Sequence, residues 1–175
     1  FLALLPLVFA LLAGWFRKSK QSHWRSGLFL ILWLLFFPNA PYIVTDLMHL
    51  GYLHQMPRWY DPLMVFSTAI TGLFAGFISL QEIELILLKD LKSWLRHILV
   101  FLICLLSGVG IYLGRVLRWN SWDLLRQPLL IFKDTLAPFL NPNDFPGSLG
   151  LIFLYTVFLY LLYQFWRANQ MTSCV

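Results

Sequence analysis

The stretch SGLFLILWLLFFPNAPYIVTDLMHL, from Ser26 to Leu50, decides the fold class of this chain. Its first half is an unbroken apolar run, and no charged residue stands between Arg25 and Asp46. About 20 residues of α-helix span the hydrocarbon core of a membrane, which is roughly 30 Å thick. The run therefore predicts a membrane-spanning helix. Its second half is unusual for such a helix, because it holds two prolines, an asparagine, an aspartate and a histidine.

Uncharged runs of similar length recur along the rest of the chain. Of the 175 residues, 59% are hydrophobic and 12% are charged, whereas soluble domains average about half apolar and about a quarter charged. The runs lie near 1–16, 26–50, 62–81, 95–117 and 147–166. Backbone groups in lipid must be satisfied within their own segment, so each run is predicted to be a helix. We predict an all-α fold, a polytopic transmembrane helix bundle, with five spans in one integral membrane domain over residues 1–175.

The chain begins at Phe1 rather than at a methionine. We therefore expect a truncated N-terminus. The segment from Phe1 to Phe16 has the apolar character of a signal peptide. No basic region precedes it and no small-residue cleavage site follows it, so it is interpreted as a helix.

Basic residues are unequally divided between the two sides of the predicted bundle. One side holds eight: Arg17, Lys18, Lys20, Arg25, Lys89, Lys92, Arg96 and Arg167. The other side holds five: Arg58, Arg115, Arg118, Arg126 and Lys133. Short cytoplasmic loops are enriched in Lys and Arg, so the first side and the C-terminus are predicted to be cytoplasmic. The net charge of +5 is thereby explained by topology and lipid headgroups, and no nucleic acid partner is expected.

The predicted outer loop from Trp119 to Gly147 contains an amphipathic segment. Its apolar residues repeat at 3-4-3-4-3 spacing: Trp122, Leu125, Leu129, Phe132, Leu136 and Phe139. A helix with one such stripe lies in the membrane interface with its apolar face in the lipid. Pro128 and Pro138 are expected to break or restart it. We predict an outer interfacial helix in the 120–140 region.

Small residues four apart occur in the third and fourth predicted spans. They form the motifs Gly72-x-x-x-Gly76 and Gly110-x-x-x-Gly114. Such spacing lets helices approach closely in lipid, so packing is the expected role. Glu82 and Glu84 follow the third span and are interpreted as solvated charges at the inner surface.

Pro38 predicts a break in the second span. Proline cannot donate a backbone hydrogen bond and disfavours helix in the residue before it. The distance from Ser26 to Pro38 is about 20 Å of helix, which is two-thirds of the way to the outer surface. Asn39 is expected to cap a new helix. That helix would carry polar residues at 3-4-3 spacing on one face: Asn39, Tyr42, Asp46 and His49. Broken helices often surround binding sites, and the alternative is a simple proline kink.

The stretch GVGIYLGRVLRWNSWD, from Gly108 to Asp123, ends the fourth span with a second polar group. Arg115 and Arg118 are one helical turn apart, and Asn120 and Asp123 follow. An unpaired charge in the membrane is expensive, so Arg115 is expected to pair with Asp46. The alternative is a pair of snorkelling arginines beside interfacial tryptophans. We predict a polar site at the outer leaflet, formed by the second and fourth spans.

The residue types of this site favour an anionic or lipid-linked ligand. Arg115 and Arg118 would hold phosphate or carboxylate. Asp46 and His49 are the catalytic acid–base candidates. There is no nucleophile motif or phosphate loop, so the sequence defines neither an enzymatic reaction nor a cofactor. A metal site that includes His49, His54 and Asp61 is a weaker alternative, because Asp-x-x-His spacing is common by chance.

Three stretches carry a family resemblance: PNAPYIVTDLMHL (38–50), WYD (59–61) and GIYLGRVLRWNSWD (110–123). In order and spacing they resemble the signature segments of an uncharacterised bacterial family of multi-pass membrane proteins, the domain of unknown function 1361. The resemblance covers the chain from about Arg25 to its end. It implies a small protein of the bacterial cytoplasmic (plasma) membrane with no established reaction. It also implies apolar sequence before Phe1, and a sixth span there would put both termini in the cytoplasm.

Three functions remain open at this stage. The first is a binder or enzyme for an anionic, lipid-linked substrate at the outer leaflet. The second is a small transporter, which the broken second span favours but the missing inverted repeat and the almost bare inner halves of the spans do not. The third is a structural subunit that contacts another membrane protein. Membrane lipid is an expected partner in all three.

Overall fold

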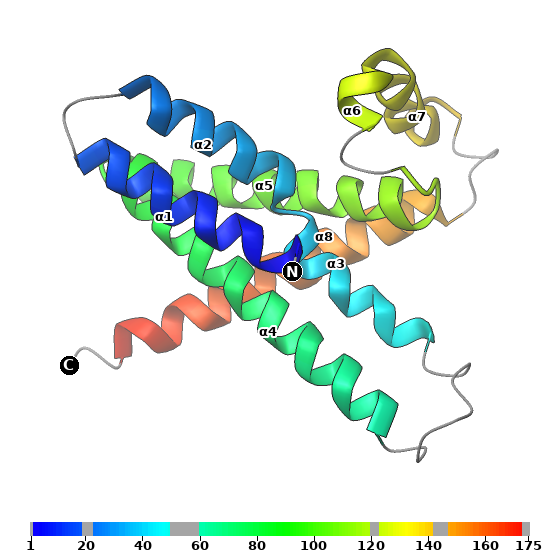
Figure 1. The fold of residues 1–175 in the computed structure, drawn as a ribbon, viewed down its shortest axis with the longest axis horizontal. Coiled ribbons are helices and arrows are strands. Elements are labelled where there is room, and N and C mark those ends of the chain that lie inside the picture. The colour runs from blue at the N-terminus through cyan, green and yellow to red at the C-terminus, as the bar shows by residue number, and fades with distance from the viewer. Residues whose placement is uncertain (1, 19–22, 50–59, 120–122, 142–146, 173–175) are drawn as a thin grey trace. The chain divides into compact units, whose positions relative to one another are not determined.

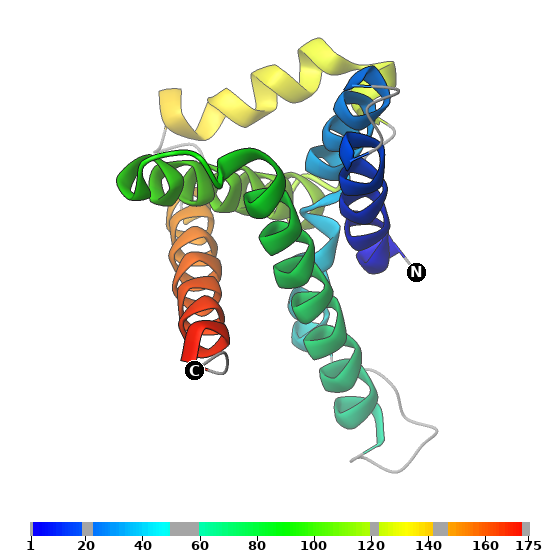
Figure 2. The ribbon, with the colours of Figure 1, turned by 90° about the vertical axis from the view of Figure 1, so that its left-hand side faces the viewer.

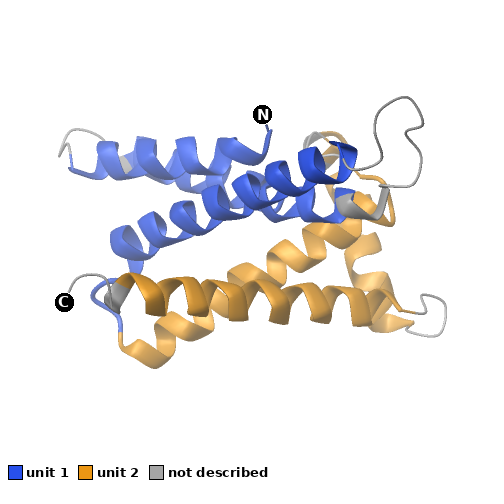
Figure 3. Ribbon diagram, turned by 90° about the horizontal axis from the view of Figure 1, so that it is seen from below, with its two compact units in different colours: residues 1–91 blue, residues 92–175 orange. Residues whose placement is uncertain are grey.

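The computed structural model describes residues 2–18, 23–49, 60–119, 123–141 and 147–172. Within these ranges all regular secondary structure is helical, which confirms the predicted all-α fold. The chain divides into two compact units, residues 1–91 and 92–175 (Figure 3).

Four helical segments are long and apolar enough to cross a membrane: Trp24–Asp46, Tyr60–Leu88, Ser93–Arg115 and Ser148–Gln170. They match the second to fifth predicted spans. The first predicted span is represented by the short helix η1 (Leu2–Leu4) and by α1 (Leu5–Lys18). The 14 residues of α1 extend only about 21 Å. A fifth span therefore stays a prediction.

In unit 1, α1 and α2 (His23–Phe36) form an antiparallel hairpin (Figure 1). The Ser26 hydroxyl donates a hydrogen bond of 3.0 Å to the carbonyl of Ala13 across this pair. The rings of Phe16 and Phe29 stack with their centroids 5.4 Å apart. Apolar and aromatic packing thus joins the two helices, with one buried hydroxyl satisfied by a backbone carbonyl.

The second span is broken next to Pro38, as predicted. After α2 ends at Phe36, the chain continues as α3 (Asn39–Tyr42) and as the 3-10 helix η2 (Ile43–His49). The prediction that Asn39 caps the new helix is wrong. Pro38 is the cap residue with φ −59°, and Asn39 is already helical. The proline ring holds φ near the helical value, so Pro38 starts the helix without a side-chain cap.

The broken span packs antiparallel to α4 (Tyr60–Ile83), and two glycines make the close approach. Before the break, the Trp33 indole donates a hydrogen bond of 3.1 Å to the Ser79 hydroxyl. Beyond the break, a Cβ at Gly76 would lie 3.1 Å from the Cβ of Ala40, and one at Gly72 would lie 2.8 Å from Cγ2 of Ile43. The packing role predicted for Gly72-x-x-x-Gly76 is confirmed.

The π-helix η3 (Glu84–Leu88) extends α4 beyond the predicted end of the third span at residue 81. The interpretation of Glu84 as a solvated charge is wrong, because this residue is only 6% exposed. Its neighbour Glu82 is half-buried. A Cβ at Gly14 of α1 would lie 3.2 Å from Ile86, so α1 packs closely against η3. The third span therefore stays packed against α1 beyond residue 81, where its uncharged run of residues ends.

Unit 2 consists of α5 (Ser93–Arg115), α6 (Asp123–Arg126), α7 (Pro128–Leu140) and α8 (Ser148–Thr172). Helices α5 and α8 are antiparallel and meet at Gly108, where a Cβ would lie 2.7 Å from Oγ1 of Thr156 and 2.8 Å from the carbonyl oxygen of Ile152. This close approach uses a glycine just before the Gly110-x-x-x-Gly114 motif, whose own packing role stays a prediction.

Helix α7 lies crosswise to α5 in unit 2 (Figure 2). Pro128 begins it, as expected, but Pro138 lies inside it and neither breaks nor restarts it. Pro138 has no backbone N–H, and it stands near the C-terminal end of the helix. Only one helical hydrogen bond is therefore lost. The predicted apolar stripe is exposed at Leu129, Phe132, Leu136 and Phe139, with Leu129 85% exposed. The opposite side, with Ile131, is buried.

Candidate functional site

The chain leaves α5 through a wide turn that carries Arg118. In this turn the N–H of Leu117 donates to the carbonyl of Tyr112 at 3.4 Å, and the N–H of Trp119 donates to the carbonyl of Leu113 at 3.0 Å. Arg118 has φ 59°, and no other non-glycine residue of the described ranges has a positive φ. Such a conformation costs about 1–3 kcal/mol in a residue with a Cβ, and it persists only where the surroundings enforce it.

The two arginines of the predicted site have different environments. Arg115 is the last residue of α5, is half-buried, and interacts electrostatically with Tyr155 of α8. Arg118 is exposed and lies outside the helix. The sequence suggested that helical spacing places the two guanidinium groups on one face. Because Arg118 lies outside the helix, this spacing does not apply to it. The Arg115 side chain is partly enclosed by other residues of unit 2, whereas the Arg118 side chain is exposed at the surface.

A hydrogen bond attaches α7 to this turn. The indole Nε1–H of Trp119 donates to Oδ2 of Asp134 at 3.0 Å. Lys133 is exposed next to Asp134. Sequence reasoning used Trp119 only as an interfacial anchor and gave Asp134 no role. One sign of such a role was visible in the sequence, because Asp134 lies off the apolar stripe of the predicted interfacial helix.

The remaining predicted residues of unit 2 are less informative. Asp123 begins the four-residue helix α6 and is half-buried. Asn120 lies outside the described residues, so its ligand-binding role stays a prediction.

In unit 1, the 3-10 conformation of η2 changes the predicted polar face. Residues three apart eclipse in a 3-10 helix, so Asp46 shares a face with Ile43 and with the backbone position of His49. Tyr42 is about 120° away from Asp46 under this geometry, so the single stripe expected for an α-helix is not formed. Asn39, Tyr42 and Asp46 are all half-buried.

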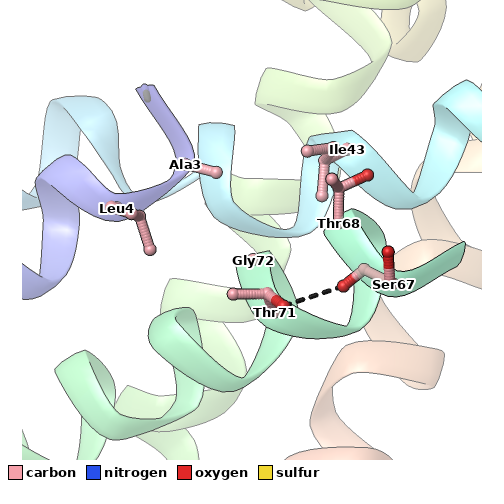
Figure 4. Close-up of a pocket in the computed structure, with 7 residues that line it drawn as sticks. All are labelled: Ala3, Leu4, Ile43, Ser67, Thr68, Thr71 and Gly72. Atoms are coloured by element: carbon pink, nitrogen blue, oxygen red, sulfur yellow. Dashed lines mark hydrogen bonds between the residues drawn. The ribbon is translucent and has the colours of Figure 1, made fainter. Parts of the chain in front are cut away.

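A cavity of about 200 Å³ lies between η1, η2 and α4 in unit 1 (Figure 4). Its lining combines apolar side chains with three hydroxyl groups: Ala3, Leu4, Ile43, Ser67, Thr68, Thr71 and Gly72. The hydroxyl residues come from one face of α4, at i, i+1 and i+4. Sequence reasoning missed this cavity, although that spacing was visible in the third span.

The metal alternative has no support among the described residues, where no three His, Cys, Asp or Glu side chains gather. Asp61 is buried in the first turn of α4, a position where a carboxylate stabilises the helix N-terminus. His54 and the side chain of His49 lie outside what the structure describes.

Asp46 belongs to unit 1 and Arg115 to unit 2. Their expected pairing, and with it a common floor made by the second and fourth spans, stays a prediction.

Long apolar helices with glycine-mediated contacts define an α-helical integral membrane protein. The chain belongs to the family described as "Protein of unknown function (DUF1361)", whose model matches residues 1–162. The match confirms the resemblance and begins earlier than the expected start near Arg25. No curated protein and no solved structure matches the chain.

Proposed function

We propose that this integral membrane protein binds an anionic, lipid-linked ligand at the outer leaflet of the bacterial cytoplasmic membrane, with its C-terminus in the cytoplasm. Arg118 is the primary contact for the anionic group, and Arg115 adds positive charge one turn earlier. The left-handed backbone of Arg118 carries the proposal. Glycine is the usual residue for this conformation, because it has no Cβ to clash. An arginine there is explained when its exposed guanidinium is needed at the end of a membrane span.

The exposed apolar stripe of α7 supports a ligand that includes a lipid chain. Water would have to solvate Leu129 and Phe132, whereas the acyl region of a leaflet would accept them. The Trp119–Asp134 bond holds this helix next to the Arg118 turn. One lipid molecule would then place its phosphate at Arg118 and its acyl chain against α7.

The proposal assigns the other predicted residues supporting roles. We propose that six residues supply further polar contacts to the ligand: Asn39, Tyr42, Asp46, His49, Asn120 and Asp123. If the bound lipid is processed, Asp46 and His49 are the proton-transfer groups. Carboxylate and imidazole side chains are the usual choices for that role.

The test uses Arg118→Gly, because glycine adopts the positive φ without strain and preserves the turn. Purified protein in nanodiscs is probed with dioleoyl phosphatidic acid against dioleoyl phosphatidylcholine, and retained lipid is measured by native mass spectrometry. A hydrogen bond to a charged group contributes about 1.5–3 kcal/mol, so the variant is expected to retain phosphatidic acid about 10- to 100-fold less well. Arg126→Gln, also at an exposed arginine of unit 2, is the matched control and should behave as wild type.

If Arg118→Gly retains phosphatidic acid as wild type does, the outer-leaflet anion site is wrong. A role as a structural or partner subunit of a membrane complex then becomes the better interpretation. A stability measurement accompanies this test, because glycine removes the backbone strain. We expect the variant to unfold at a higher temperature in detergent, by the equivalent of about 1 kcal/mol.

A small transporter is the second candidate function, favoured by Glu84. This carboxyl group is buried towards the C-terminal end of the third span, and it begins a π-helical segment of the kind frequent at functional sites. Proton flux into proteoliposomes loaded with a pH-sensitive dye tests the idea. Glu84→Gln should abolish the flux, while Glu82→Gln, at a half-buried neighbour, should not. Flux no greater than in protein-free vesicles removes this candidate.

A further inference from the structure

We propose that the cavity between η1, η2 and α4 is a second binding site, which takes a primary ammonium group. The ammonium belongs either to a small free amine or to the headgroup of an amine-bearing lipid. The lining of this cavity lies wholly in unit 1, whereas Arg118 of the proposed anion site belongs to unit 2.

The hydroxyl groups of the cavity are hydrogen-bond acceptors for a ligand. Ser67 donates to the carbonyl of Met64 at 2.9 Å, Thr68 donates to the carbonyl of Val65 at 2.9 Å, and Thr71 donates to the carbonyl of Ser67 at 2.8 Å. Each hydroxyl proton is thus used within α4, and the oxygen lone pairs remain available. A ligand that binds these hydroxyl oxygens must donate hydrogen bonds.

The charge next to the cavity favours a positive donor. None of the seven described residues that line it is basic. Asp46 lies one 3-10 turn beyond Ile43, about 6 Å along η2, on the face that Ile43 turns toward α4. A carboxylate one turn along η2 from a residue that lines the cavity favours an ammonium group over a neutral hydroxyl, because a charged donor forms the stronger hydrogen bond.

The size and surroundings of the cavity fit a headgroup at the surface of the protein. A volume of about 200 Å³ is large enough for a two-carbon amine. Ser67, Thr68 and Thr71 are exposed, and the neighbouring Phe66 and Ile70 are exposed apolar residues of the same span. A lipid molecule could place its chains against the apolar residues and its ammonium among the hydroxyls.

The competing explanation is that these hydroxyls are merely tolerated in lipid, since each is satisfied by its own helix. Thr135 of α7 separates the two explanations. Its hydroxyl donates to the carbonyl four residues earlier at 2.8 Å, the same bond that Thr71 makes, but it does not line the cavity. Replacement of either threonine by the isosteric valine removes one hydroxyl of identical local geometry.

The experiment compares dioleoyl phosphatidylethanolamine with dioleoyl phosphatidylcholine in nanodiscs, with native mass spectrometry as the readout. Both headgroups carry a positive nitrogen, but the quaternary ammonium of phosphatidylcholine has no N–H to donate. Wild type is expected to retain phosphatidylethanolamine at least tenfold better. Thr71→Val and Ser67→Ala should each reduce that preference about three- to tenfold, the range of one net hydrogen bond. Asp46→Asn should reduce it at least tenfold, and Thr135→Val should leave it unchanged.

Free ethanolamine then identifies the source of the ammonium group. Competition by millimolar ethanolamine would show that the amine alone is bound, and retention of phosphatidylethanolamine despite ethanolamine would show that the lipid headgroup is required. Both results support the site. Equal retention of the two lipids by wild type overturns it, and so does an equal effect of Thr71→Val and Thr135→Val.

Discussion

The indole of Trp119 and the carboxylate of Asp134 are joined by a hydrogen bond of 3.0 Å between Nε1 and Oδ2. The bond links the turn that follows a membrane-spanning helix to a helix that lies crosswise to it. The indole N–H can only donate and the Oδ2 atom accepts, so the direction of the bond is fixed. It therefore determines where the apolar stripe of α7 is held relative to Arg118.

Loss of this bond should loosen α7 without unfolding α5 and α8. We expect Trp119→Phe, which keeps the aromatic ring but removes the donor, to raise amide hydrogen exchange across α7 at least tenfold. A hydrogen bond to a charged group contributes about 1.5–3 kcal/mol. Trp94→Phe is the control, because Trp94 is an exposed tryptophan at the other end of α5. Exchange in α7 that equals wild type would show that apolar packing alone holds the helix.

The glycines at helix contacts should be intolerant of a methyl group. Gly72→Ala would force Cβ against Ile43 and a backbone carbonyl, and Gly108→Ala would force it against Thr156 and another carbonyl. Overpacking of this kind costs about 1–3 kcal/mol, so both variants should unfold at lower temperature in detergent. At Gly27 a Cβ meets nothing within 4 Å. Gly27→Ala should therefore be neutral or stabilising by up to about 1 kcal/mol, and similar losses at all three positions would contradict the packing account.

The expected pairing of Asp46 with Arg115 is tested by a double-mutant cycle. Removal of one partner of a buried ion pair costs about 3–5 kcal/mol, because the other charge is left uncompensated. Arg115→Ala should therefore lower the unfolding temperature, and addition of Asp46→Asn should restore part of the loss. Strictly additive effects of the two changes would show that the residues do not interact. The predicted site between the second and fourth spans would then be wrong.

The predicted orientation is tested by labelling of single cysteines in intact cells. A cysteine at Lys18 or Lys92 should resist a membrane-impermeant thiol reagent, because short basic loops stay in the cytoplasm. A cysteine at Gln55 or Asn143 should react. Of the two native cysteines, Cys104 is buried and should contribute little background, and Cys174 is replaced by serine in every variant. Labelling after permeabilisation confirms that every site is reactive, and the reverse pattern in intact cells would place the proposed sites on the cytoplasmic side.

The sequence by itself determined the fold class, the four long spans and the break at Pro38. Each of these follows from a one-dimensional property. A charge-free run of about 20 residues must be helical in lipid, and a proline removes a backbone donor wherever it stands. The close approach at Gly72 and Gly76 was also predictable, because residues four apart share a helical face.

Only the tertiary structure decided how these elements end and what they enclose. The 3-10 winding of Ile43–His49 accompanies the seating of Ile43 against Gly72, and it moves Tyr42 away from the face of Asp46. Arg118 is held in a left-handed conformation by a turn whose hydrogen bonds reach back into α5. The burial of Glu84 and the hydroxyl-lined cavity beside α4 likewise depend on neighbouring segments. Contacts between segments far apart in the chain set the burial of Glu84 and the enclosure of the cavity, whereas the turn at Arg118 is held by local hydrogen bonds to Tyr112 and Leu113.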